Sequence, residues 1–384
     1  MIFNTNFLKM KQITILLLFI FAAALSGCST LASKLAKKDE AGVVIARRAQ
    51  VRSSTAVVAA DLVEVNRGDQ VDILDSDVDQ NGERWLRVRA HDEENTEGWI
   101  ESRNVMPNDV LERSRKLAEE DKDVPPQATG QLRASTNLRL SPDRNGNENI
   151  MMKLDSGSKF DIITWKRVPK PKTSETTESD TAPKAGSVQN ANKGKKDSDE
   201  EKEPEETNEL WYKVRLSPSI SPAPGGWIYG KQVELTVPSD IIFYRTGREF
   251  VAWHRLDSDA DVEANSKRDK DAAKDAKPGS WVILEKSSSN EPHKIDEPDF
   301  DRIYVLGYDK YNQEHYTAYR SPDLKGFLPL RVDEQGENKT FIVRIQDEDG
   351  QIKEQQYKVF HDDRGFTRVT PPGSGEGQKG RRKR

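Results

Sequence analysis

One order of short segments occurs twice in this chain, and it constrains the fold more than any other feature. The first copy has a Val-Arg-Ser segment, a Gly-x-x-hydrophobic strand, a Trp-Leu-Arg-Val-Arg strand and a Gly-Trp-Ile strand at 51–53, 68–74, 85–89 and 98–100. The second copy keeps this order at 138–140, 157–163, 211–215 and 226–228. Short alternating runs between turn residues predict the strands of a small all-β barrel. The repetition therefore indicates two barrels in tandem.

Both copies resemble bacterial SH3-like domains in their Gly-x-x-hydrophobic, Trp-x-x-Val and Gly-Trp-Ile strands. The resemblance covers 41–110 and 130–236. It implies two small barrels, each with a shallow groove lined by aromatic side chains that binds peptides.

Charged segments separate and interrupt the two copies. In the second copy a run at about 168–208 is rich in Lys, Glu, Ser, Thr, Asp and Pro and has almost no apolar residues. Such a run cannot bury enough apolar surface to offset its ordering entropy, so we expect a disordered insert in a hairpin loop. Between the copies, 111–129 is a charged helical or flexible linker, with Asn108 as a candidate cap for a short helix that acts as a spacer.

The remaining folded region, 237–370, is also predicted to be β-rich, and it resembles no family that we recognise. Its candidate strands are 241–244, 250–255, 281–285, 302–308, 315–319, 340–345 and 356–360. Asp349-Gly350 is a hairpin turn signal, and the charged stretch 257–277 reads as a loop. The expected fold class is all-β, with two SH3-like barrels, a third mostly antiparallel domain and disordered charged insertions. A basic tail at 371–384 either touches anionic surfaces or is solvated.

The N-terminal segment predicts export and lipid attachment. Lys9 and Lys11 precede a short apolar run at 13–25, which is typical of a secretory signal rather than of a membrane-spanning helix. The following Leu-Ser-Gly-Cys at 25–28 resembles the lipobox of bacterial lipoproteins. The resemblance implies a signal peptide over 1–28, a lipidated Cys28, a linker over 29–40 and, because Ser29 follows the cysteine, the outer membrane, facing the periplasm or the cell surface.

Composition and residue spacing argue against several classes of function. The chain has 60 basic and 65 acidic residues and a net charge of −5, which does not favour nucleic-acid binding. Its single cysteine, Cys28, cannot form an internal disulfide or act as a nucleophile once lipidated. The five histidines are scattered singly, at 91, 254, 293, 315 and 361. We therefore predict no catalytic residue, no cofactor and no metal site; a half-match to a calcium loop at 77–82 has a sufficient explanation as a hairpin turn.

The candidate ligand-binding residues are on the Trp-x-x-Val strand of each copy. Alternation places one set of side chains inward and the other outward. The outward sets are Trp85, Arg87 and Arg89 in the first copy and Trp211, Lys213 and Arg215 in the second. The two tryptophans either form a binding surface for peptides or sugars with carboxylates or close the open end of a barrel. For Trp99 and Trp227 the closing role is favoured.

These features predict a non-catalytic envelope lipoprotein. Its partners would be the membrane, through the N-terminal lipid, and cell-wall peptide, glycan or another envelope protein, through the barrels. Two alternatives remain open: a structural or assembly lipoprotein of a secretion or surface-export complex, and a cell-wall hydrolase with its active site in 237–370.

Overall fold

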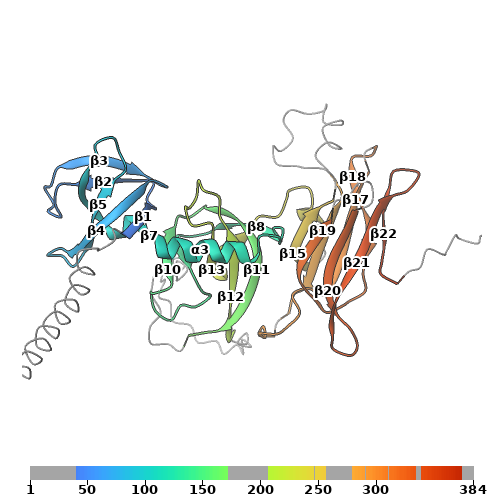
Figure 1. The fold of residues 1–384 in the computed structure, drawn as a ribbon. Helices are drawn as coiled ribbons and strands as arrows, with labels where there is room; N and C mark the ends of the chain where they lie inside the picture. The colour runs from blue at the N-terminus through green and yellow to red at the C-terminus, as the bar shows by residue number, and fades with distance from the viewer. Residues whose placement is uncertain are drawn as a thin grey trace, which may run out of the picture. The chain divides into compact units, whose positions relative to one another are not determined.

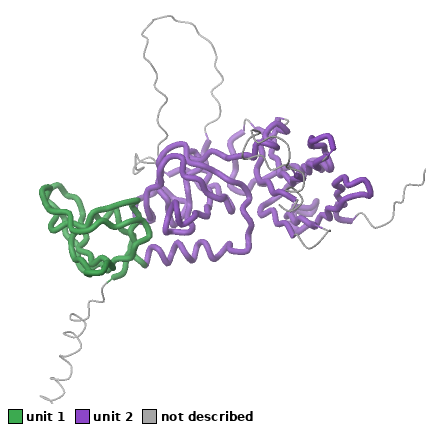
Figure 2. The backbone as a smooth tube through the Cα atoms, turned by 90° about the horizontal axis from the view of Figure 1, so that it is seen from above, with its two compact units in different colours: residues 1–108 green, residues 109–384 purple. Residues whose placement is uncertain are grey.

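The structure, a computed structural model, describes residues 40–171, 206–245, 247–256, 279–289, 291–309, 311–333 and 339–373. The chain divides into two compact units, 1–108 and 109–384 (Figure 2). The predicted signal peptide with Cys28, most of the charged insert, the stretch 257–277 and the tail from 374 lie outside the described residues. Within the described part of the chain, no helix has the length and apolar character needed to cross a membrane. The prediction of a mostly antiparallel β protein is confirmed.

The first barrel is one seven-stranded antiparallel sheet in the order β3-β2-β6-β5-β4-β1-β7 (Figure 1). Its strands are β1 (Glu40–Val44), β2 (Arg48–Arg52), β3 (Asp61–Asn66), β4 (Gln70–Val78), β5 (Arg84–Ala90), β6 (Glu97–Glu101) and β7 (Val105–Pro107). All seven strands contribute to a single buried cluster, with Val44, Val51 and Val88 among its members. A sheet whose strands share one core must curl around that core, as a barrel does.

The turn between β4 and β5 explains the calcium-like sequence at 77–82. Gly82 has a φ of +81°, which glycine adopts without strain. One carboxylate oxygen of Asp79 accepts hydrogen bonds from the backbone N–H groups of Asn81 and Glu83, at 2.8 and 2.9 Å. These acidic residues therefore stabilise a hairpin turn.

The second barrel repeats the first strand for strand, in the order β10-β9-β13-β12-β11-β8-β14. Its strands are β8 (Ala128–Leu132), β9 (Thr136–Arg139), β10 (Ile150–Leu154), β11 (Lys159–Pro169), β12 (Asn208–Arg215), β13 (Gly225–Tyr229) and β14 (Val233–Leu235). The pairing of β11 with β12 continues to Pro169 and Asn208. The expected insert therefore joins two strands that are paired up to its ends.

The C-terminal region forms two four-stranded antiparallel sheets. The first sheet has β15 (Arg248–Arg255), β16 (Trp281–Ser287), β17 (Arg302–Asp309) and β18 (Glu314–Arg320), and the second has β19 (Gly326–Asp333), β20 (Lys339–Gln346), β21 (Ile352–His361) and β22 (Thr367–Thr370). Both sheets contribute to one buried cluster, which includes Val282 and Val305 from the first and Phe341 and Val343 from the second. The region is therefore a β-sandwich. The predicted turn at Gly350, with a φ of +81°, joins β20 to β21.

The sequence prediction differs from the sandwich in three places. The apolar run at 241–244 is predicted as a strand, and this is wrong: it forms the short 3-10 helix η4 (Ile242–Tyr244). The N–H groups of Ile241 and Ile242 both donate to the carbonyl of Pro238, which winds the chain into a helical turn. Strands β19 and β22 are absent from the prediction, because a proline interrupts the first and the second has only four residues.

The second barrel and the sandwich belong to the same compact unit and share buried polar contacts. The side chain of Gln127 donates to the carbonyl of Leu330 at 2.9 Å and accepts from the N–H of Leu330 at 2.6 Å. The carbonyl of Gln127 also accepts from the N–H of Trp253 at 2.9 Å. The indole of Trp165 donates to Asp299 at 2.8 Å. A buried glutamine with all these partners fixes the barrel against both sheets of the sandwich.

Candidate binding site on the first barrel

The tryptophans of the two outward sets are buried: Trp85 is 4% exposed and Trp211 is 0% exposed. Of the two roles that the sequence leaves open for them, burial favours packing within the barrel over an exposed binding surface. Trp85 lies under the guanidinium of Arg52, 5.9 Å from the ring centroid, and donates from its indole N–H to Asp79 at 3.3 Å. Trp211 packs against Tyr229 at 5.6 Å between ring centroids. Alternation gives the face on which a side chain lies, but not what covers that face.

The partly exposed ring of this face belongs to Trp99. Directly opposed residues of neighbouring strands share a face, and Trp99 of β6 is opposed by Arg52 of β2 and by Arg87 of β5. Trp99 is therefore flanked by two guanidinium groups, whereas the sequence favours a role in closing the barrel. We call Arg52, Arg87, Arg89, Glu97 and Trp99 the Trp99 face.

The second barrel has the equivalent surface, but a helix occupies it. Trp227 is opposed by Arg139 and Lys213, and we call Arg139, Lys213, Arg215, Gly225 and Trp227 the Trp227 face. The helix α3 (Asn108–Glu120) packs there, at Gly225: the hydroxyl of Ser114 donates to the carbonyl of Gly225 at 2.6 Å and accepts from its N–H at 3.2 Å. A Cβ on Gly225 would lie only 3.2 Å from the Cβ of Ala118. The helix expected as a spacer is thus part of the second barrel.

The charged residues predicted to bind a ligand in the second barrel instead bind this helix. The ammonium of Lys213 contacts the carboxylate of Glu120 at 2.7 Å, and its side chain is only 8% exposed. The guanidinium of Arg215 donates to the carbonyl of Asp121 at 2.9 Å. Basic side chains at a helix C-terminus satisfy carbonyls that have no partner within the helix. Lys213 and Arg215 therefore have a structural partner within the chain.

In the first barrel a glutamate side chain, not a helix, contacts the corresponding basic residues. Glu97 occupies the register position that corresponds to Gly225, because it opposes Arg89 as Gly225 opposes Arg215. Its two oxygens contact Arg87 at 3.0 Å and Arg89 at 2.8 Å. The hydrogen bond from Arg89 lowers the pKa of Glu97 against the opposing effect of desolvation. One carboxylate is shared by two guanidinium groups, and the Arg87 side chain remains 50% exposed.

A loop with exposed apolar side chains borders the Trp99 face. The guanidinium of Arg52 donates to the carbonyls of Val57 at 2.8 Å and Ala59 at 3.1 Å, which fixes the loop between β2 and β3. Val57 and Val58 are 84% and 93% exposed. This loop is absent from the residues predicted from the sequence to bind a ligand; its signal is an apolar run, Ala-Val-Val-Ala-Ala at 56–60, that fits neither a strand nor a polar turn.

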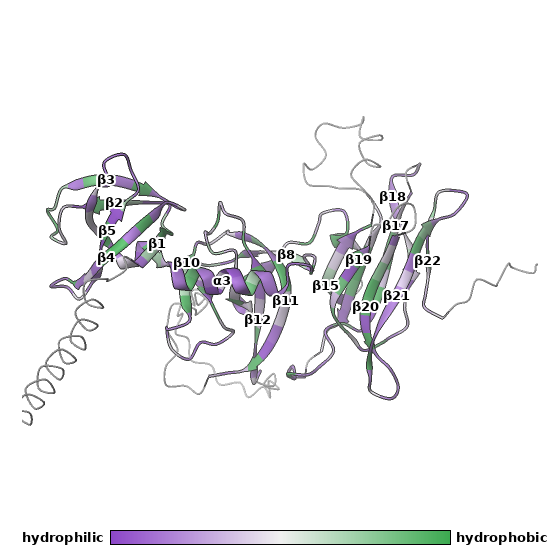
Figure 3. Cartoon of the chain, in the orientation of Figure 1, coloured by the Kyte–Doolittle hydropathy of each residue, from purple (hydrophilic) through white to green (hydrophobic). Residues whose placement is uncertain are grey.

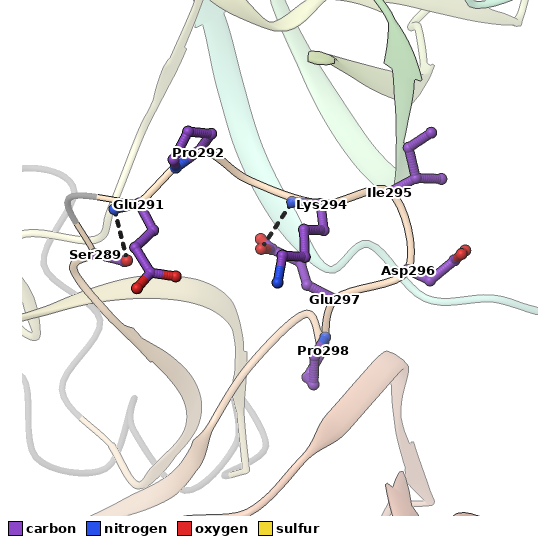
Figure 4. A pocket seen from close by; sticks show the side chains of 8 residues that line it. All are labelled: Ser289, Glu291, Pro292, Lys294, Ile295, Asp296, Glu297 and Pro298. Atoms are coloured by element: carbon purple, nitrogen blue, oxygen red, sulfur yellow. Dashed lines mark hydrogen bonds between the residues drawn. The ribbon is translucent and has the colours of Figure 1, made fainter. Parts of the chain in front are cut away.

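A hollow of about 470 Å³ lies in the loop between β16 and β17 (Figure 4). Its lining residues are Ser289, Glu291, Pro292, Lys294, Ile295, Asp296, Glu297 and Pro298. Glu297 accepts from Lys286 at 2.7 Å and from the N–H of Lys294 at 3.1 Å, and it contacts Arg167 of the second barrel at 3.1 Å. Its carboxylate is thus engaged by several donors and anchors the loop.

The described residues contain no group of three His, Cys, Asp or Glu side chains that could hold a metal ion. The histidines contact polar partners in separate places. His91 contacts Asp72 at 3.2 Å, His293 contacts Glu297 at 2.7 Å, and the Nε2 atom of His315 is 2.8 Å from the carbonyl of Gly279.

Comparison with known proteins identifies no family. No family model and no curated protein matches the chain. Among solved structures, it is similar to NlpC2 and NlpC1 from Trichomonas vaginalis at 9% and 10% identity, with TM-scores of 0.15 and 0.14, covering 88% and 87% of this chain and 94% of each of theirs. An NlpC/P60 family protein from Bacillus cereus ATCC 10987 has 10% identity and a TM-score of 0.19, covering 88% of this chain and 95% of its own. Similarities this low carry no argument about fold or function.

Proposed function

We propose that the chain is a non-catalytic bacterial envelope lipoprotein whose first barrel binds a carboxylate-bearing peptide on the Trp99 face. The observation that carries the proposal is the difference between the two barrels. Their strands have the same order and register, yet α3 packs against Gly225 and Lys213 of the Trp227 face, whereas the corresponding Glu97 and Arg87 of the Trp99 face keep 36% and 50% of their side chains exposed. The second barrel is thus structural and the first is available to a ligand.

The Trp99 face has groups that can contact both the carboxylate and the apolar side chains of such a peptide. Arg87 is half exposed, and a guanidinium binds a carboxylate through two parallel hydrogen bonds. A ligand carboxylate would take over part of the role of Glu97, just as the acidic end of α3 does in the second barrel. Trp99, Val57 and Val58 would contact small apolar side chains of the peptide. Cell-wall peptide is the ligand of this class that a lipid-anchored envelope protein meets.

The proposed anchor limits where this surface acts. Attachment of lipid at Cys28 leaves the linker 29–40 between the bilayer and β1. A fully extended linker of this length spans at most ~40 Å. The first barrel would therefore reach ligands close to the membrane surface.

The test is retention of the full-length protein by purified peptidoglycan sacculi. Arg87→Glu should reduce retention about tenfold, because it replaces the carboxylate-binding group by a like charge. Val57→Ser with Val58→Ser should reduce it less. Arg113→Glu on α3 is the matched control, since its side chain is 51% exposed against 50% for Arg87. Equal retention of all variants, each folded by circular dichroism, would overturn the proposal.

A protein partner is the second candidate, and α3 is the observation that favours it. The Trp227 face shows that this sheet surface accommodates a helix with an acidic C-terminal end. In-cell crosslinking from position 58 should then give one defined protein adduct without retention on sacculi. The remaining alternative, a cell-wall hydrolase, predicts clearing by residues 109–384 in a zymogram.

A further inference from the structure

Three aromatic rings pack together at one end of the first sheet of the sandwich. The His315 ring is 5.1 Å from Tyr308 and 5.5 Å from Tyr244 between centroids, tilted by 56° and 72°. Tyr308 and His315 oppose each other on β17 and β18, next to the hairpin turn, and Tyr244 comes from η4. All three are partly exposed. Residues from two distant segments thus form one half-buried aromatic surface.

A buried carboxylate oxygen without a partner belongs to the same cluster. One oxygen of Asp240 accepts from the indole N–H of Trp281 at 3.0 Å. Its other oxygen is buried and has no hydrogen-bond donor among the residues that the structure describes. Burial raises the pKa of Asp240, and burial followed by the charge of Asp240 raises the pKa of Tyr308. A buried acceptor without a donor is costly unless a ligand or water supplies one.

His315 adds a second acceptor to the cluster. Its Nε2 atom is 2.8 Å from the carbonyl oxygen of Gly279. A carbonyl can only accept, so Nε2 carries the proton and Nδ1 of the neutral ring is an acceptor. The hydroxyls of Tyr244 and Tyr308 can donate or accept. The cluster therefore suits a ligand with several hydroxyl donors.

Two further rings extend from the same end into solvent. Phe243, next to Tyr244, is 87% exposed, and Tyr311, in the turn that joins Tyr308 to His315, is 91% exposed. Exposed apolar rings that gather beside one another mark a binding surface, whereas single exposed rings are ordinary.

We propose that Phe243, Tyr244, Tyr308, Tyr311 and His315, with Asp240, form a saccharide-binding platform. A pyranose ring has a flat face of C–H groups that stacks on aromatic rings, and its hydroxyls can form hydrogen bonds with His315 and with the hydroxyls of Tyr244 and Tyr308. The His315 ring packs directly against Tyr308 at a tilted angle and against Tyr244 edge-on, and such a packed surface fits a flat sugar better than it fits an ammonium ion in an aromatic cage. This site lies in the sandwich and is independent of the ligand proposed for the first barrel.

The experiment is retention of the full-length protein on three insoluble polysaccharides: cellulose, chitin and cell-wall glycan strands freed of peptide. The wild type should be retained by at least one, and Phe243→Ala with Tyr311→Ala should weaken retention at least about tenfold because the stacking surface is lost. Both side chains are exposed, so these substitutions leave the fold intact. Phe360→Ala, which removes a 38% exposed ring of β21 outside the platform, is the control and should change nothing.

Each remaining outcome would overturn the platform. No retention on any of the three polysaccharides, or equal retention of wild type and the ring variants, would exclude it. Binding of tetramethylammonium, measured by calorimetry, without retention on any polysaccharide would assign a cation site instead. Arg87→Glu should leave retention on peptide-free glycan unchanged. The proposals for the platform and for the first barrel can therefore be tested separately.

Discussion

At the scale of single residues, Glu297 shows how one carboxylate joins two domains. It contacts Arg167 of the second barrel and Lys286 of the sandwich, at 3.1 and 2.7 Å. Burial opposes its ionisation, but the hydrogen bond from Lys286 and the charge of Arg167 outweigh burial and lower the pKa of Glu297 to about 2. The unperturbed value is 4.5, so this residue stabilises the fold fully above pH 4.5 and loses its contribution as the pH falls toward 2.

We therefore expect Glu297→Gln to lower the free energy of unfolding by about 2 kcal/mol at pH 7, after allowing for solvent screening. The difference from wild type should shrink as the pH falls from 4.5 toward 2, because the wild-type carboxylate also becomes neutral. Urea unfolding between pH 2 and pH 7 measures it. Glu354→Gln, which removes the exposed pair with Arg331, is the control and should have little effect. A difference that does not change with pH would contradict the assignment.

A second prediction concerns the buried ion pair of the second barrel. Arg144 binds both oxygens of Glu209, at 2.5 and 3.2 Å, and its guanidinium lies 4.4 Å from the ring centroid of Tyr229. Arg144→Ala leaves Glu209, whose side chain is 2% exposed, without its partner. We expect a loss of about 3–5 kcal/mol in urea unfolding. The double variant Arg144→Met with Glu209→Leu should recover most of it; if it does not, the loss comes from packing and not from the unpaired charge.

At the scale of elements, α3 shows which contacts hold a charged helix on a barrel. Figure 3 shows that it is mostly hydrophilic, and of its side chains only Leu111 and Ser114 are buried. So few apolar contacts cannot hold a helix of 13 residues by burial alone. The close approach at Gly225 and the ion pair with Lys213 supply the rest.

We expect Gly225→Val to displace α3, because even a Cβ at this position would lie 3.2 Å from the Cβ of Ala118 and a branched side chain needs more room. The amide hydrogens of 109–120 should then exchange at least about tenfold faster, as a local loss of 1–2 kcal/mol implies. Hydrogen exchange measured by mass spectrometry tests this. Arg115→Ala, on the exposed side of the helix, is the control. Unchanged protection in Gly225→Val would mean that α3 is held by other contacts.

At the scale of the whole molecule, the second barrel and the sandwich are expected to unfold together because of Gln127. Its side chain satisfies both backbone groups of Leu330, and its carbonyl satisfies Trp253. Gln127→Ala leaves the buried N–H and C=O of Leu330 without these partners, at a cost of about 1–3 kcal/mol each. Calorimetry of 109–384 should change from one transition to two. Gln131→Ala, at an exposed position of β8, is the control, and a single transition in both variants would show that the interface does not depend on Gln127.

The sequence by itself determined the β-rich fold and the doubled strand order. Alternation, glycine turns and repeated tryptophans are local properties, and local hydrogen bonding and side-chain periodicity act on them directly. The hairpin turn at Gly350 is another feature that the local sequence determines. The structure of the run at 241–244 is not such a feature, because two backbone hydrogen bonds to the carbonyl of Pro238 wind this apolar segment into a helical turn, which the apolar pattern does not reveal.

Only the tertiary structure decided which surfaces are open. Trp85 and Trp211 lie on the faces that alternation assigns to them, yet Arg52 and Tyr229 cover their rings. Lys213 and Arg87 hold the same position in the repeat, and α3 makes one structural while the other stays half exposed. The physical reason is that exposure depends on what packs over a face, and the covering residues are distant in sequence. The aromatic cluster around His315 could not be predicted for the same reason: Tyr244 and Tyr308 come together only when η4 packs on the sheet.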